Sequence, residues 1–268
     1  MIARLRDGLA VYFCLLRGAL AARMTDRADL GISMIIMLLA DLVVPLTTLL
    51  VYQHGAGFTG WQRDEALLLQ ATFLIAKGIA FPFCFGMIWT TTELVREGTF
   101  ELLLLKPRST LLLLLGHSFQ PEDTGKLLGG IALFCLALPN VTIGADADSS
   151  AALLGFAALL LLAVLTLFGF ALLMTCLSFV WIGNSRLQEI FDAVSAFALY
   201  PHGIFTRSAL GWLTWVIPVS VLGYLPASVL LGRPDPALPL AVGGALCFVL
   251  VVIGLWRMML ARYASAGG

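Results

Sequence analysis

The chain has 268 residues, of which 60% are hydrophobic and 12% are charged, and its formal net charge is zero. Average soluble domains carry about 25% charged residues, so this composition and a mean hydropathy of +0.97 exclude an ordinary soluble domain. The zero net charge leaves no excess of positive charge for binding nucleic acid. Membrane lipids are its first expected partner. Transmembrane β-strands would alternate apolar and polar residues, and runs such as LLGFAALLLLAVLTLF do not. We therefore expect an all-α polytopic membrane protein.

The first 28 residues carry arginines throughout an apolar stretch. A secretory signal peptide would instead have an uninterrupted apolar centre and a small-residue cleavage site. Residues 1–28 are therefore predicted to form an amphipathic helix in the membrane interface, with its arginines toward the lipid headgroups.

Six apolar stretches reach the roughly 20 helical residues that cross the hydrocarbon core. Lys and Arg concentrate on the cytoplasmic side of membrane proteins. With a cytoplasmic N-terminus, 12 of the 16 Lys and Arg residues lie inside, three lie outside and Lys77 falls within a span. Both termini are then cytoplasmic. The six predicted spans are residues 31–52, 66–92, 124–143, 151–182, 187–205 and 237–260.

The apolar segment 211–231 is broken by Pro218 and Pro226. If it crossed the membrane, there would be seven spans, and Arg257 and Arg262 would lie outside. We therefore expect re-entrant or extracytoplasmic helices over residues 207–233, because a broken backbone is tolerated where protein or water satisfies it. A full crossing is the alternative.

Asp41 and Lys77 lie near the centres of the first two predicted spans. Ionisable residues at membrane depth mark functional sites by default, and these two could meet because their helices are antiparallel neighbours. They form either a proton, ion or substrate site or a buried ion pair that fixes helix register. Glu189 and Asp192 open the fifth span, where we expect them to complement the helix dipole.

The sequence contains no G-x-S-x-G or H-E-x-x-H motif, and its five cysteines are too scattered for a metal site. The pair Gly125-Lys126 is followed by Leu127, where a phosphate-binding loop needs Ser or Thr. We therefore expect a non-catalytic chain with no cofactor or metal of its own. Any ATP and Mg²⁺ would be bound by a partner.

Residues 93–116, ELVREGTFELLLLKPRSTLLLLLG, begin with charges and end with an apolar run. This segment is too polar at its start to lie in lipid and too apolar at its end to be fully solvated. We expect it to lie along the cytoplasmic membrane surface and to contact a soluble partner. Pro107 stops or kinks a helix, and the cations on either side of it suit anionic headgroups.

This segment and two later motifs resemble the ABC-2-type permeases, in particular short bacterial ABC-2 family transporter proteins. The later motifs are IPVSVLGYLPASVLLGR at 217–233 and RYASAGG at 262–268. The resemblance covers residues 1–268 as one transmembrane domain, with Phe100 in place of the usual Leu. The matching residues of the segment are Glu97, Gly98, Thr99, Leu103, Leu104, Leu105, Pro107 and Gly116.

The resemblance implies six transmembrane helices, an interfacial N-terminal helix, a cytoplasmic coupling helix after the second span and a re-entrant helical pair before the sixth. It implies an ATP-driven exporter in the bacterial cytoplasmic membrane. Two permease subunits, identical or homologous, would each form half of the translocation pathway and be coupled to two copies of a cytosolic ATPase. The coupling contacts it implies are Glu93, Arg96, Glu97, Gly98, Thr99 and Glu101.

The alternative function is a secondary transporter that uses Asp41 and Lys77 as its coupling pair. Inverted repeats would support that alternative, and none is evident in the sequence. An intramembrane enzyme is a third class, but the sequence offers it no cluster of acid, base and nucleophile.

Overall fold

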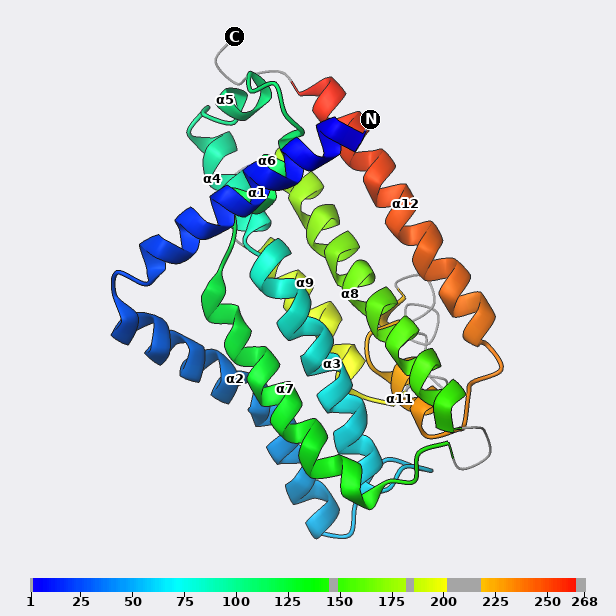
Figure 1. Ribbon diagram of the computed structural model, residues 1–268. Coiled ribbons are helices and arrows are strands. Elements are labelled where there is room, and N and C mark those ends of the chain that lie inside the picture. Colours follow the sequence, from blue (N-terminus) through cyan, green and yellow to red (C-terminus); the bar gives the residue numbers. More distant parts are fainter. Residues whose placement is uncertain (1, 145–148, 182–185, 202–217, 264–268) are drawn as a thin grey trace.

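The computed structural model describes residues 2–144, 149–181, 186–201 and 218–263. Within these residues every regular element is a helix, and Figure 1 shows the long helices running side by side. Three predicted features lie outside the described residues. They are the end of the fifth span at 202–205, the start of the re-entrant segment at 207–217 and most of the last motif at 264–268.

Four helical stretches of the described chain are long and apolar enough to cross a membrane. They confirm the first, second, fourth and sixth predicted spans by length and composition. The second span consists of two consecutive helices. The four are α2 (Arg27–Gln53), α3 (Arg63–Cys84) continued by α4 (Met87–Arg96), α8 (Ser149–Val180) and α12 (Leu238–Arg262).

The third and fifth predicted spans are shorter than expected, so six crossings are not confirmed. Helix α7 (Thr124–Ala137) has 14 residues and α9 (Leu187–Ala196) has 10, against the roughly 20 that a crossing needs. Pro139 and Pro201 follow these helices closely. Each α-helix is followed by a single 3-10 turn, Leu138–Asn140 after α7 and Phe197–Leu199 after α9. Pro139 lies in the first of these turns and Pro201 just after the second, and proline lacks the backbone donor that a continuing helix needs.

The second span breaks at Phe85–Gly86, just after Pro82 in the last turn of α3. The carbonyl of Pro82 accepts a hydrogen bond of 2.9 Å from the backbone N–H of Gln120. A side chain at Gly86 would collide with the backbone carbonyl of Ser118. The segment from Ser118 to Gln120 is therefore packed into the break.

Glycines let α7 approach α3 and α2 closely. A side chain at Gly78 of α3 would collide with the backbone of Leu127, and one at Gly125 would collide with the backbone of Met34. Small residues at helix contacts are typical of packing inside membranes. This close contact places the first turn of α7 beside the middle of α3.

One end of the molecule gathers α1 (Ile2–Arg23), α5 (Glu101–Leu104), α6 (Thr110–His117) and the last turns of α12 (Figure 1). Helix α1 lies across α6, where Leu15 occupies the space over Gly116. Its inner face is partly buried at Val11 and Leu15, whereas Arg17 is exposed. The start of α1 and the end of α12 therefore lie at the same end.

The opposite end holds α11 (Tyr224–Leu230), which packs against α3 and α8. Its seven residues extend about 10 Å, too short to cross a 30 Å hydrocarbon core. Arg233 forms an ion pair with Glu65 at the start of α3 and lies 6.0 Å from the ring of Trp61. The described part of the predicted re-entrant segment therefore stays at this end.

Candidate functional site

A cavity of about 500 Å³ opens between the middles of α2 and α3, the start of α7, and α9. Its walls combine apolar side chains with an unusual concentration of charge. Charged groups near the middle of membrane-spanning helices are costly and mark functional sites, so this cavity is the candidate site. Its charged lining residues are Asp41, Lys77, Glu122, Asp123, Lys126 and Asp192.

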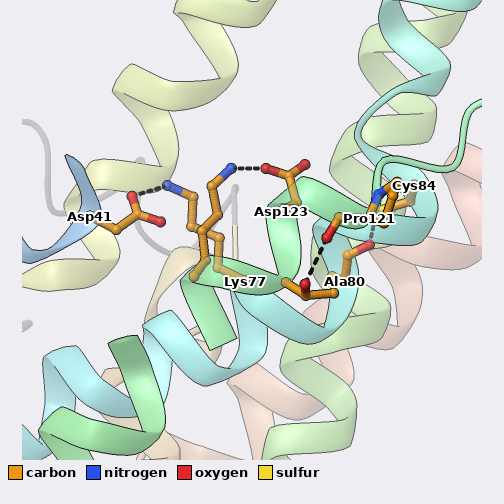
Figure 2. A network of polar contacts seen from close by, with 8 residues as sticks. Asp41, Lys77, Ala80, Cys84, Pro121 and Asp123 are labelled. Atoms are coloured by element: carbon orange, nitrogen blue, oxygen red, sulfur yellow. Dashed lines mark hydrogen bonds and ion pairs between the residues drawn. The ribbon is translucent and has the colours of Figure 1, made fainter. Parts of the chain in front are cut away.

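Two ion pairs lie side by side in this cavity. Nζ of Lys77 donates a hydrogen bond to Oδ1 of Asp41 over 2.7 Å, joining the middles of α3 and α2 (Figure 2). Lys126, in the first turn of α7, pairs with Asp123 three residues earlier. Only 8% of the Lys126 side chain and 3% of the Asp123 side chain are exposed. Both pairs are therefore largely removed from solvent.

Both ammonium groups lie close to the aromatic ring of Phe81. Its ring centroid is 5.1 Å from Nζ of Lys77 and 4.6 Å from Nζ of Lys126, within the range of cation–π attraction. The ring stacks on Phe85 with centroids 4.4 Å apart. Each ammonium group is thus held by a carboxylate and by the same aromatic ring.

Three carboxylates of the cavity each keep a buried oxygen without a hydrogen-bond partner in the described structure, namely Oδ2 of Asp41, Oε2 of Glu122 and Oδ2 of Asp123. Buried polar atoms are nearly always hydrogen-bonded, so we expect each of these oxygens to bind water, a proton or a ligand. Glu122 also pairs with Arg23 at 3.2 Å. This contact joins the end of α1 to the cavity wall.

The prediction that Asp192 complements the start of its helix is wrong. Helix α9 begins at Leu187, so Glu189 lies in its first turn and Asp192 in its second. The dipole acts mainly within the first turn. Asp192 instead lines the cavity, where it interacts electrostatically with Lys77 and Lys126. Its carboxylate forms no ion pair or hydrogen bond with any described residue.

The segment predicted to form a coupling helix is folded as several short pieces. After α4 the chain turns at Gly98, whose φ is +70°, a conformation that glycine adopts without strain. Thr99 N–H donates to the Leu94 carbonyl over 2.9 Å, and Gly98 N–H donates to that of Val95. This pair of bonds is the Schellman motif that ends helices. Helices α5 and α6 follow, separated by the Pro107 turn.

Phe100 fixes this segment to the ends of two spans. It is fully buried, and its ring centroid lies 5.0 Å from that of Phe179 in α8 and 5.2 Å from that of Tyr263 after α12. Burial, and secondarily the charge of Glu101, raise the pKa of the Tyr263 phenol. The residue that departs from the family pattern is therefore the segment's aromatic anchor.

The residues expected to contact a partner surround this anchor. Glu93, Arg96 and Glu97 are exposed, whereas Thr99 and Glu101 are half-buried. The leucines that follow point in different directions. Leu103 is buried, whereas Leu102 and Leu105 are 60% and 80% exposed. Charged and apolar surface therefore lie next to each other at this end.

The family described as ABC-2 family transporter protein matches residues 35–267. The chain belongs to this ABC-2 family. Searches of curated proteins and of solved structures found no match. Membership makes the chain an integral membrane component of a transporter, from a family that is generally non-catalytic and associates with an ABC ATPase.

Four of the six charged residues that line the cavity of this ABC-2 protein were not identified as site residues from the sequence; only Asp41 and Lys77 were. Lys126 was one of the 12 Lys and Arg residues counted on the cytoplasmic side, but it is 7% exposed and lines the cavity. The available signal was its spacing from Asp123, because residues three apart on a helix face each other. Glu122 carried no such signal, since its partner Arg23 is distant in sequence.

Proposed function

We propose that this ABC-2 protein is the permease subunit of an ATP-driven exporter, forming half of the translocation pathway and drawing its energy from a separate cytosolic ATPase. The observation that carries the proposal is the path of residues 93–126. This stretch begins with exposed charges at one end of the molecule and ends at Asp123 and Lys126 in the cavity. It links the surface that we propose contacts the ATPase to the candidate transport site within one short length of chain.

The exposed part of this path suits a soluble partner. Glu93, Arg96 and Glu97 offer charges of both signs on the last turns of α4, and complementary charges give specificity to protein contacts. The Gly98 turn directs the chain to Thr99 and Glu101. We infer that these six residues, Gly98 included, receive the movement of the ATPase.

The buried part of the path would transmit that movement. Phe100 ties α5 to the ends of α8 and α12, and Gln120 is bonded to the break in the second span. Packed interiors respond as connected solids, so a displacement of α5 and α6 moves the loop at Gln120. Asp123, three residues further on, then shifts relative to Lys77 and Asp41.

The outer face of α2 supports an assembly in the membrane. Ile35, Leu39, Val43 and Leu46 are each 55–58% exposed, which suits lipid or a second permease subunit, identical or homologous. In the proposed complex, two copies of the ATPase bind ATP and Mg²⁺. The charge asymmetry of the loops favours cytoplasmic termini in a bacterial cytoplasmic membrane.

The Asp41–Lys77 pair is the observation that favours the alternative of a secondary transporter. Both residues line the cavity at the middle of long helices. However, their 2.7 Å ion pair already neutralises both charges, as a pair that fixes helix register would. The exporter proposal therefore treats the pair as structural.

The test is co-expression with a candidate ABC ATPase, recognised by its phosphate-binding loop motif. We expect the two proteins to co-purify and inside-out vesicles to accumulate cargo with ATP, whether or not the proton gradient is collapsed. A variant ATPase lacking its catalytic glutamate is the control and should support no uptake. Uptake that follows the proton gradient and ignores ATP would establish the secondary transporter instead.

A further inference from the structure

We propose that the cavity binds amphipathic organic cations, with the carboxylate of Asp192 as the counter-ion of the positive group. This inference rests on the proposed function, because it names the cargo class of the same transport site. Neither the family match nor the coupling path bears on the charge of the cargo. The argument comes from the charge balance, the walls and the unpartnered atoms of the cavity.

The charge balance of the cavity leaves one negative charge in excess. Its lining contains four carboxylates and two ammonium groups, and Arg23 outside it balances Glu122. Lys77 and Lys126 are each bound to a carboxylate and to the ring of Phe81. Asp192 is the remaining carboxylate, and it pairs with no described cation.

This balance favours a cation over an anion. An anion would have to displace Asp41 or Asp123 from its lysine and leave that carboxylate buried without its charge partner, a strongly unfavourable exchange. A cation needs no such exchange, because the carboxylate of Asp192 forms no ion pair with the residues that the structure describes. The field at the cavity therefore attracts positive charge.

The unpartnered oxygens are a second, independent sign of a ligand. Asp123 is 2% exposed and lines the cavity, yet its Oδ2 has no hydrogen-bond partner in the described structure. Oδ2 of Asp41 is also buried and has no hydrogen-bond partner in the described structure. A positive group in the cavity would compensate the negative potential of these oxygens as well as that of Asp192.

The uncharged walls specify the rest of the ligand. Phe73, Phe85 and Trp89 line the cavity together with aliphatic side chains of α2. Aromatic faces attract organic cations, and apolar walls bury a hydrocarbon body. The volume of about 500 Å³ lies within the usual range of small-molecule pockets. The fitting class is a hydrophobic cation of drug-like size.

The test compares two ions of matched shape and opposite charge, tetraphenylphosphonium and tetraphenylborate. Binding of each to the full-length protein in lipid nanodiscs is measured by equilibrium dialysis, with empty nanodiscs as the blank. We expect saturable binding of the cation alone. Asp192→Asn should weaken it at least tenfold, because the counter-ion is lost, and Asp192→Glu should retain most of the affinity.

The matched control is Glu189→Gln, which removes a carboxylate from the same helix. Both residues are exposed, but only Asp192 lines the cavity. The Glu189→Gln variant should bind the cation like the original protein. Equal binding of both ions, or unchanged cation affinity in a folded Asp192→Asn protein, would overturn the inference. Because the assay contains no ATPase, its failure leaves the coupling proposal intact, and a failure of ATPase co-purification leaves the binding result intact.

Discussion

The backbone N–H of Gln120 donates a 2.9 Å hydrogen bond to the carbonyl of Pro82, so the loop after α6 is bonded to the point where the second span breaks. Gln120 itself lines the cavity. This bond brings the proposed coupling segment, the helix break and the cavity together, and the account depends on it.

Replacing Gly86 by alanine should disrupt this junction. The added methyl group would collide with the carbonyl of Ser118, which is backbone and cannot rotate away. We expect a loss of about 1–3 kcal/mol, typical of overpacking, and reduced cargo-stimulated ATP hydrolysis. Thermal unfolding and ATPase assays in nanodiscs measure both effects. Gly18→Ala, in a helix with open space around it, is the control and should be neutral or slightly stabilising.

Phe100→Ala should detach the coupling segment from α8 and α12. Truncating a fully buried phenylalanine costs about 3–5 kcal/mol, so the melting temperature should fall clearly, and coupling should fall with it. Phe100→Leu should lose less of both. Phe13→Ala, at a 60% exposed position, should change neither. A normal melting temperature in Phe100→Ala would refute the anchoring role.

The Asp41–Lys77 pair should behave as a structural unit. Asp41→Asn alone leaves the buried charge of Lys77 without its partner and should cost up to about 3–5 kcal/mol. Adding Lys77→Gln should recover much of that stability. A double-mutant cycle, scored by thermal unfolding and by transport per folded molecule, separates the two roles. If the folded single variant couples ATP hydrolysis but does not transport, the pair contributes to translocation.

The four long helices were predictable because about 20 apolar residues in succession have no other common structure. The meeting of Asp41 with Lys77 was foreseeable for the same reason, since each charge interrupts a long apolar run. The third and fifth helices were predicted too long because hydropathy continues through Pro139 and Pro201, whereas the α-helices end before these prolines, at Ala137 and Ala196.

The rest of the cavity depends on tertiary contacts that hydropathy does not report. Asp123 and Lys126 lie at the end of an apolar run, where charges usually face water. The glycine contacts of α7 instead bury them against α3. The start of the fifth helix at residue 187 was predicted correctly, but Asp192 was assigned to that start although it lies in the second turn. That its side chain lines the cavity depends on contacts with other helices. In the sequence, Phe100 is only a substitution for the usual Leu of the family pattern. Its ring contacts with Phe179 and Tyr263 show that it anchors the segment.

The central claim is that exposed charges near Gly98 couple this protein to an ATPase, and Glu97→Arg tests it most directly. The variant should insert and melt normally, because Glu97 is exposed, yet lose most cargo-stimulated ATP hydrolysis and co-purify poorly with the ATPase. Asp64→Arg makes the same charge change at the opposite end of the molecule and should leave coupling intact. Unchanged coupling in Glu97→Arg would contradict the account.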